Sequence, residues 1–137
     1  MKTIFCLLMS MLAVLSLTSC ATPKHKPAKT VDTPETVVVV YQVRSGREAD
    51  LKELLDRAWK VYQREHMVHA QPHVIVQETT PDGKAKITEI FTWVSHKAPE
   101  QAPAQVAEIW NEMQAMCESR NGQPGLGGGE VQLIEPR

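Results

Sequence analysis

One carboxylate in the sequence occupies a position where burial is costly. Glu89 lies between Ile87 and Phe91 in the run KITEIFTWV, residues 86–94, whose β-branched and aromatic composition is typical of a strand. A carboxylate buried there without a partner would have a raised pKa, and such a group can act as a general base. The other interpretations are a salt bridge across a dimer or a place at the edge of a cavity. Glu89 is our first candidate catalytic residue.

Imidazole and aromatic groups lie near the same strand. His96 follows the end of the strand in a predicted loop, and loop residues often carry function, so we predict His96 as a proton relay for Glu89. Four aromatic residues are candidates for the wall of a ligand pocket, with packing in the core as the alternative. These residues are Tyr41, Phe91, Trp93 and Trp110.

Three histidines have a spacing that suggests metal binding. His66, His69 and His73 form the pattern H-x2-H-x3-H, at the end of a predicted helix and across Gln71–Pro72. A fixed three-ligand geometry is hard to hold there, and metal ligands also need hydrogen-bonded partners that orient them. We therefore place the three histidines in a surface loop, with contact to a metal or haem as the alternative, and we predict no metal and no cofactor.

The N-terminal residues indicate where the protein is delivered. Lys2 precedes the apolar run IFCLLMSMLAVLSL, residues 4–17, which is shorter than the roughly 20 apolar residues of a permanent membrane span. The next residues, LTSC, resemble the lipobox of bacterial lipoproteins, whose cysteine becomes the first mature residue and carries lipid. We predict a signal peptide at residues 1–19 and a lipid on Cys20, with an ordinary secretory site as the alternative.

That lipid would attach the protein to a membrane of the cell envelope. Ala21 after the cysteine resembles the pattern of Gram-negative lipoproteins that reach the outer membrane and face the periplasm, although a Gram-positive source would alter this inference. Residues 20–34 then form the lipidated cysteine and a flexible tether rich in proline, threonine and lysine. Residues 35–137 have the size of one domain with one core.

Charge and cysteine content restrict the function further. Acidic residues outnumber basic ones in residues 35–137, and no basic patch with interleaved aromatic residues occurs, so nucleic acid is not a predicted partner. Cys117 lies on the apolar stripe of a predicted helix, where cysteine behaves as a small buried hydrophobic residue. The run GQPGLGGG, residues 122–129, lacks the Lys-Ser/Thr of a phosphate loop and is predicted as a flexible connector.

The hydrophobic periodicity predicts the order strand, helix, strand, strand, helix, strand. Helices are expected within residues 44–66 and 98–122, because apolar residues recur there every three or four positions. The turn PDGK should join the second and third strands in a hairpin. The predicted strands cover residues 35–43, 73–80, 86–94 and 130–136.

These elements predict an α+β fold. We expect a ferredoxin-like βαββαβ domain, with two helices on one face of a four-stranded antiparallel sheet. The uncovered face should alternate apolar with polar residues, yet the first strand is apolar on both faces and the third carries Ile90 and Val94 on its second face. We therefore predict that this face packs against another surface, most simply a second copy in a homodimer.

Two runs of residues resemble the dimeric α/β-barrel superfamily, in particular antibiotic-biosynthesis-monooxygenase-type domains. These runs are EIFTWVSHKAPEQ (residues 89–101) and the preceding VVVVYQVRSGREADLKELL (residues 37–55). The helix start with Gly46, Glu48 and Leu51 belongs to this likeness. The resemblance implies dimers that pack sheet on sheet, with a pocket between sheet and helices in each subunit. Some members are cofactor-free oxygenases of quinol-like substrates and some degrade haem. The histidine that family enzymes often carry on the second helix is missing from QAPAQV, residues 101–106.

Together these inferences predict an envelope-anchored lipoprotein whose domain binds a small aromatic ligand, with cofactor-independent monooxygenase activity as one form of this function. Trp93 would then form part of the pocket wall. The alternative is a non-catalytic dimeric interaction module at the cell envelope. An open pocket that Glu89 faces would favour the first hypothesis, and a pocket filled by Trp93 and Trp110 would favour the second.

Overall fold

The structure is a computed structural model, and it describes residues 32–134. The predicted signal peptide, the predicted lipid site Cys20 and the tether as far as residue 31 lie outside the described residues, so they stay predictions. Within residues 32–134, no helix is long and apolar enough to cross a membrane.

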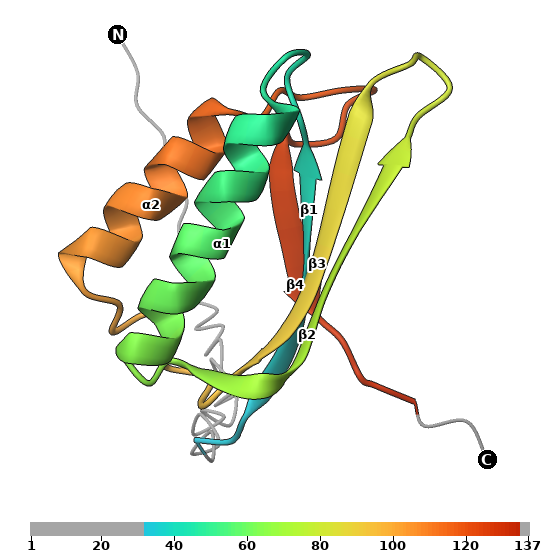
Figure 1. Ribbon diagram of the computed structural model, residues 1–137. Helices are drawn as coiled ribbons and strands as arrows, with labels where there is room; N and C mark the ends of the chain where they lie inside the picture. The colour runs from blue at the N-terminus through green and yellow to red at the C-terminus, as the bar shows by residue number, and fades with distance from the viewer. Residues whose placement is uncertain (1–31, 135–137) are drawn as a thin grey trace, which may run out of the picture. The chain divides into compact units, whose positions relative to one another are not determined.

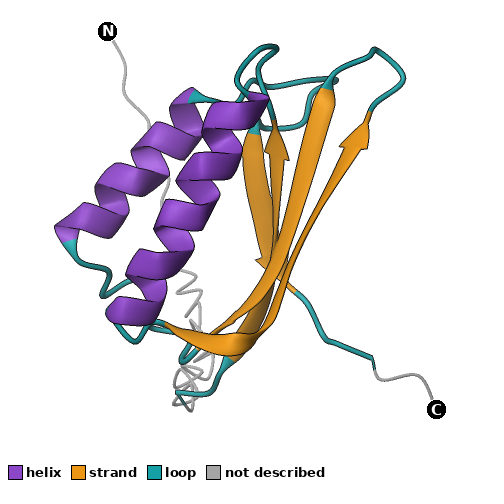
Figure 2. Cartoon of the chain, viewed as in Figure 1, coloured by secondary structure: helices purple, strands orange, loops and turns teal. Residues whose placement is uncertain are grey.

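Four strands and two helices make up the described chain. They follow in the order β1 (Glu35–Gln42), α1 (Glu48–Arg64), β2 (Val68–Thr79), β3 (Ala85–Trp93), α2 (Ala104–Ala115) and β4 (Leu126–Glu130). The strands form one antiparallel sheet in the order β2-β3-β1-β4. Both helices cover the same face of this sheet, as Figures 1 and 2 show. The predicted ferredoxin-like α+β fold is confirmed.

The core lies between the helices and the covered face of the sheet. Helix α1 buries the six residues that its periodicity predicted: Leu51, Leu54, Leu55, Ala58, Val61 and Tyr62. Helix α2 buries Val106, Ile109 and Met113, and the predicted burial of Cys117 is confirmed at 2% exposure. Burial raises the pKa of the Cys117 thiol to about 11, so this thiol is protonated at neutral pH.

The last strand differs from the prediction. We expected a flexible connector at residues 122–129 and a strand at residues 130–136, but β4 is Leu126–Glu130 and consists largely of glycine. A Cβ atom on Gly128 would lie 2.3 Å from the carbonyl oxygen of Val38 on the neighbouring strand. Glycine is required by this close approach of two backbones, and its lack of a side chain removes the alternation that identifies a strand in the sequence.

The second strand starts earlier than predicted. We expected it to begin at His73, whereas β2 begins at Val68 and contains a bulge between Val68 and His73. Pro72 lies within this irregular stretch. Proline interrupts the sequence pattern of a strand, but β2 is an edge strand of the sheet, where a missing backbone N–H is tolerated.

The second helix ends earlier than predicted, at Ala115 rather than near Gly122. The chain that follows α2 pairs with the end of β1 instead of continuing the helix. The backbone N–H of Arg44 donates to Met116 at 2.9 Å, and that of Glu118 donates to Gln42 at 2.9 Å. These hydrogen bonds satisfy the backbone groups that another helical turn would have used.

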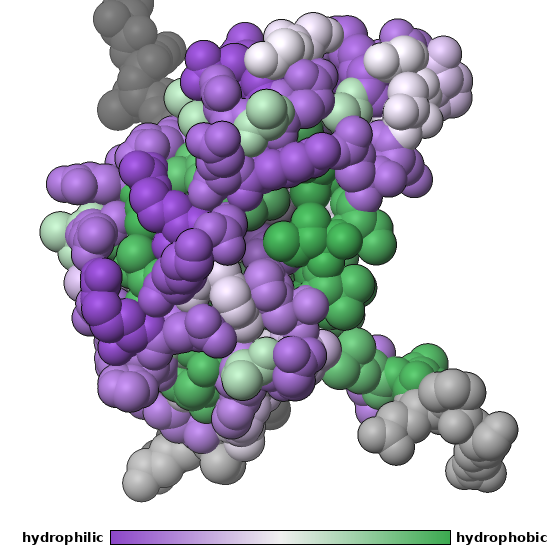
Figure 3. Space-filling view, viewed as in Figure 1, coloured by the Kyte–Doolittle hydropathy of each residue, from purple (hydrophilic) through white to green (hydrophobic). Residues whose placement is uncertain are grey.

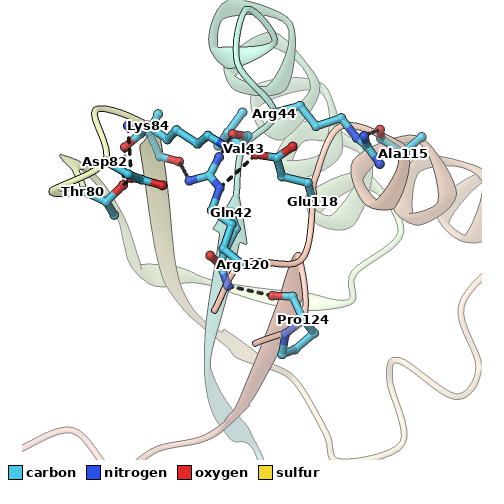
Figure 4. A network of polar contacts seen from close by, with 11 residues as sticks. Gln42, Val43, Arg44, Thr80, Asp82, Lys84, Ala115, Glu118, Arg120 and Pro124 are labelled. Atoms are coloured by element: carbon cyan, nitrogen blue, oxygen red, sulfur yellow. Dashed lines mark hydrogen bonds and ion pairs between the residues drawn. The ribbon is translucent and has the colours of Figure 1, made fainter. Parts of the chain in front are cut away.

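Arg120 fastens this segment to the sheet (Figure 4). The residue is 9% exposed, and its side chain donates to the backbone oxygens of Ala85 and Val43, while its Nε lies 3.1 Å from a carboxylate oxygen of Glu118. Lys84 contacts the same Glu118 oxygen at 2.7 Å. The network joins the ends of β1 and β3 to the segment after α2, and it has a structural role.

Candidate functional site

Glu89 is buried on the covered face of the sheet. Strand β3 alternates its side chains between the two faces, so Ile87, Glu89 and Phe91 all point toward the helices. Glu89 is 2% exposed. A carboxylate this deeply buried needs hydrogen-bonding partners, because its desolvation would otherwise be very costly.

The two strands that flank β3 each provide one partner. The Tyr41 hydroxyl on β1 donates to Oε2 of Glu89 at 2.8 Å. His73 on β2 places its Nε2 3.0 Å from Oε1 of the same carboxylate. In the strand register Tyr41 lies opposite Ile87 and His73 lies opposite Phe91, so both partners are diagonal neighbours of Glu89.

Helix α1 fixes the plane of the imidazole. The Trp59 indole stacks on the His73 ring, with ring centroids 3.5 Å apart and an interplanar angle of 12°. The side chain of His73 is 17% exposed, whereas that of Glu89 is 3% exposed. His73 is therefore the member of this group that connects the buried carboxylate with the surface.

Burial and charge within this group keep the Tyr41 hydroxyl protonated. Burial first, and then the charge of Glu89, raise the pKa of Tyr41 far above its usual range, so Tyr41 remains a hydrogen-bond donor at neutral pH. His73 and Glu89 share one hydrogen bond, between Nε2 and Oε1. We call Tyr41, Glu89 and His73 the carboxylate relay.

The other predicted pocket residues pack against one another. The rings of Phe91 and Trp93 meet edge to face with centroids 4.7 Å apart, and Trp93 meets Trp110 edge to face at 6.3 Å. Trp110 donates from Nε1 to the Tyr62 hydroxyl at 2.6 Å. Because Trp93 is only 7% exposed, these rings form a filled aromatic core rather than an open wall.

His96 is not in the environment that its predicted role, a proton relay for Glu89, requires. Its Nδ1 is 2.7 Å from Oε2 of Glu35, at the start of β1, and its side chain is 51% exposed. The structure thus pairs His96 with Glu35 and gives Glu89 a different imidazole partner, His73.

The three histidines with metal-like spacing do not converge. His66 lies in the turn after α1 with a φ of 54°, and His69 is exposed on β2. Within the described part of the chain, no group of three or more His, Cys, Asp or Glu side chains is arranged to hold a metal ion. The surface-loop placement is wrong for His73, which is half-buried beside Glu89.

A signal for His73 was present in the sequence. The hairpin turn at residues 81–84 fixes the register of β2 against β3, so counting back from it pairs Ile75 with Glu89. His73 then falls on the same face, one diagonal step from the carboxylate. Pro72 concealed this relation, because it placed His73 at the predicted start of the strand, next to a loop.

Comparison with known proteins identifies the fold and nothing finer. No protein-family model matches the sequence, and no curated protein matches it either. The structure is similar to that of a mutant form of SnoaB, a cofactor-independent oxygenase from Streptomyces nogalater, with a TM-score of 0.56 and 15% identity over 75% of this chain and 95% of that one.

Two further solved structures show the same likeness. Rv0793 from Mycobacterium tuberculosis matches with a TM-score of 0.54 and 11% identity, over 76% of this chain and 98% of that one. Protein SO0527 from Shewanella oneidensis matches with a TM-score of 0.53 and 13% identity, over 74% of this chain and 91% of that one. The chain therefore has a ferredoxin-like α+β fold, which it shares with these solved structures.

Proposed function

We propose that the domain binds a small aromatic ligand at the carboxylate relay and transfers a proton there, in a monooxygenase-type reaction that needs no cofactor. The observation that carries this proposal is the buried carboxylate of Glu89, held at 3.0 Å from an imidazole that reaches the surface. Strongly desolvated titratable groups with a defined partner are enriched at functional sites.

The relay suits a ligand that bears an acidic hydroxyl, such as a quinol. The quinol O–H would give its proton to His73, and Glu89 would stabilise the imidazolium that results. The quinolate is an electron-rich anion that can react with O2. The products are a hydroxylated quinone and water, so one oxygen atom enters the ring, the other leaves as water, and the quinol supplies all the electrons.

The fold comparison supports the same class of chemistry. SnoaB is a cofactor-independent oxygenase, and its structure shares the arrangement of strands and helices described above. At 15% identity this likeness extends to the fold alone, so the assignment of roles to Glu89 and His73 depends on their geometry in this chain.

Oxygen uptake with a panel of quinols tests this proposal. We expect Glu89→Gln and His73→Gln to reduce kcat/KM by about 100-fold, because loss of a general base typically costs a factor of 10² to 10⁴. His69→Gln, a change at an exposed histidine on the same strand, is the matched control and should keep the wild-type rate. The same rate in Glu89→Gln as in the wild type, or no uptake with any quinol, removes the enzymatic function.

A second candidate is a non-catalytic dimeric interaction module. The specific observation in its favour is the filled aromatic core, because Trp93 and Trp110 occupy the space that a ligand would need between sheet and helices. Tryptophan fluorescence separates the two candidates: quinols that bind near Trp59 should quench its emission, and a Trp59→Phe variant should lose that signal. Absence of quenching by every quinol tested favours the interaction module.

For both candidates we propose the same location, the cell envelope, with the protein held through lipid on Cys20 and facing the periplasm from the outer membrane. The support is the lipobox-like LTSC sequence followed by Ala21, together with the tether that separates Cys20 from β1. The tether is long enough to hold the domain on the order of 40 Å from the membrane.

A further inference from the structure

The two tyrosines of the chain are both buried, but their hydroxyl groups have different partners. Tyr41 and Tyr62 are each 3% exposed. The Tyr41 hydroxyl donates to Oε2 of Glu89 at 2.8 Å. The Tyr62 hydroxyl instead accepts from Nε1 of Trp110 at 2.6 Å, and within residues 32–134 no hydrogen bond joins it to a carboxylate. Tyr41 therefore has a base in contact with its proton.

This base makes Tyr41 the easier of the two phenols to oxidise. Loss of one electron makes a phenol strongly acidic, so a tyrosine is oxidised readily where a base accepts its proton in the same step. If the Tyr41 proton moves to Oε2 of Glu89, the products are a neutral phenoxyl radical and a neutral carboxylic acid. Glu89 is 2% exposed, and burial disfavours the charged form of a carboxyl group. The oxidation thus removes a buried negative charge.

Trp59 provides a route by which the electron can leave. Its indole stacks on the His73 ring with centroids 3.5 Å apart, and His73 Nε2 lies 3.0 Å from Oε1 of Glu89. Trp59 is half-buried, whereas Trp93 in the aromatic core is 7% exposed. Rings and hydrogen bonds in contact therefore connect Tyr41 with an indole that solvent reaches, and an electron can cross each of these contacts by tunnelling.

The surface next to this route is apolar. Strand β2 continues from His73 into Val74, Ile75 and Val76, which are 45%, 43% and 54% exposed. Ile75 lies on the same face of the sheet as His73, because strand side chains alternate between the faces. Figure 3 shows hydrophobic side chains in green on the side of the molecule where the strands lie. An uncharged organic radical suits such a surface better than a charged oxidant, which would lose hydration there.

We propose that Tyr41 is a redox-active tyrosine that reduces organic peroxyl radicals by way of Trp59. The peroxyl radical takes one electron from Trp59 and one proton from solvent, and it becomes a hydroperoxide. The oxidised indole then takes one electron from Tyr41, whose proton passes to Glu89. This activity goes beyond the proposed oxygenation and needs no quinol.

Flash oxidation of the full chain in detergent tests the role of Tyr41. Light and a cobalt(III) ammine quencher convert a ruthenium tris-bipyridine complex to ruthenium(III), a one-electron oxidant, and electron paramagnetic resonance of frozen samples detects tyrosyl radicals. We expect a tyrosyl signal from the wild type and from Tyr62→Phe, in which Tyr41 is the single tyrosine. Tyr41→Phe should lose this signal. Near-UV circular dichroism verifies that each variant is folded.

The yield of the radical tests the proton acceptor. We expect Glu89→Gln to lower the tyrosyl yield by at least about tenfold, because an amide oxygen accepts a hydrogen bond but does not take the proton. Formation of the radical in the wild type should also be slower in D2O than in H2O, an isotope effect that a purely structural role of Glu89 does not produce. His69→Gln, at an exposed position on β2, is the control and should keep the wild-type yield.

Transient absorption tests the route. Trp59→Phe should remove the fast phase of tyrosyl formation, and Trp110→Phe, a change at the other half-buried indole, should keep it. Peroxyl radicals released from an azo initiator test the oxidant: the wild type should delay oxidation of a fluorescent probe for longer than Tyr41→Phe does.

Three results would overturn the inference. They are a folded Tyr62→Phe chain without a tyrosyl signal, a yield that Glu89→Gln leaves unchanged, and equal protection of the probe by the wild type and Tyr41→Phe. None of these measurements includes a quinol, so failure of the proposed oxygenation is recognised separately.

Discussion

At the scale of single residues, the two oxygens of Glu89 have different partners. Oε2 accepts from the Tyr41 hydroxyl and Oε1 lies 3.0 Å from the His73 imidazole. Each contact offsets part of the cost of placing a carboxylate at 2% exposure. The partners differ in their environment: Tyr41 is enclosed in the core, whereas His73 is half-buried on the edge strand β2.

This difference leads to a prediction for Tyr41→Phe. Loss of the hydroxyl leaves a buried carboxylate oxygen without a donor, so we expect the free energy of unfolding to fall by about 1–3 kcal/mol. In a Glu89→Gln background the same change should cost less, because a neutral amide oxygen depends less on its donor. Urea denaturation of the wild type, the two single variants and the double variant gives the coupling free energy between Tyr41 and Glu89. An equal cost in both backgrounds would contradict the contact between Tyr41 and the charged carboxylate.

A second residue-scale prediction concerns Cys117 and alkaline pH. Burial raises the pKa of its thiol from 9.0 to about 11 in the folded protein. As the pH rises through this window, the unfolded chain releases its thiol proton while the folded chain keeps it, so the unfolded state binds fewer protons and the free energy of unfolding falls. The buried hydroxyls of Tyr41 and Tyr62, whose pKa values are also raised, act in the same direction above pH 10.

Comparison of the wild type with Cys117→Ala separates the thiol from the tyrosines. We expect the wild type to lose more stability than Cys117→Ala between pH 9 and pH 11, where the thiol alone distinguishes them. Melting temperatures measured across this range provide the comparison. Parallel pH profiles would show that the thiol titrates alike in the folded and unfolded chains.

At the scale of elements, β4 has three consecutive glycines at its centre and Leu126 as its one residue packed against the core. Its backbone pairs with β1 from Tyr41 to Val37, and the glycines allow the two strands to approach closely. A helix such as α1 is recognisable through a stripe of side chains, whereas β4 is held by the backbone of its neighbour. For this reason composition and periodicity locate α1 correctly but place the last strand at residues 130–136, whereas β4 is Leu126–Glu130.

The glycines of β4 therefore differ in their tolerance of a side chain. Gly128→Ala would place Cβ 2.3 Å from the Val38 oxygen and 3.1 Å from the Val39 Cα, so we expect a loss of about 1–3 kcal/mol from forced backbone shifts. Gly129→Ala meets nothing within 4 Å and should change stability by no more than about 0.5 kcal/mol. Thermal unfolding of both variants tests this, and similar melting temperatures would mean that β4 does not approach β1 in this way.

At the scale of the whole molecule, the described residues hold the carboxylate relay, and the proposed lipid anchor on Cys20 lies before them in the sequence. If the lipid proposal is correct, wild-type protein should partition into the detergent phase of Triton X-114 and incorporate labelled palmitate. Cys20→Ser should remove both properties, because a serine cannot carry a thioether-linked lipid.

Cys117→Ser is the matched control for this experiment. It changes the other cysteine of the predicted mature chain and should leave the partition and the label unchanged. Equal partition of the wild type and Cys20→Ser would show that Cys20 carries no anchor.

The sequence by itself determined the order of elements, the buried stripes of both helices and the central position of Glu89, because each depends on local periodicity. Only the tertiary structure decided which imidazole meets Glu89. His73 and His96 are both candidates from the sequence, but the register of the hairpin brings His73 to the carboxylate, while His96 pairs with Glu35. Such contacts depend on how strands align and how closely backbones approach. The turn at residues 81–84 indicates how β2 aligns with β3, but hydrophobic periodicity does not.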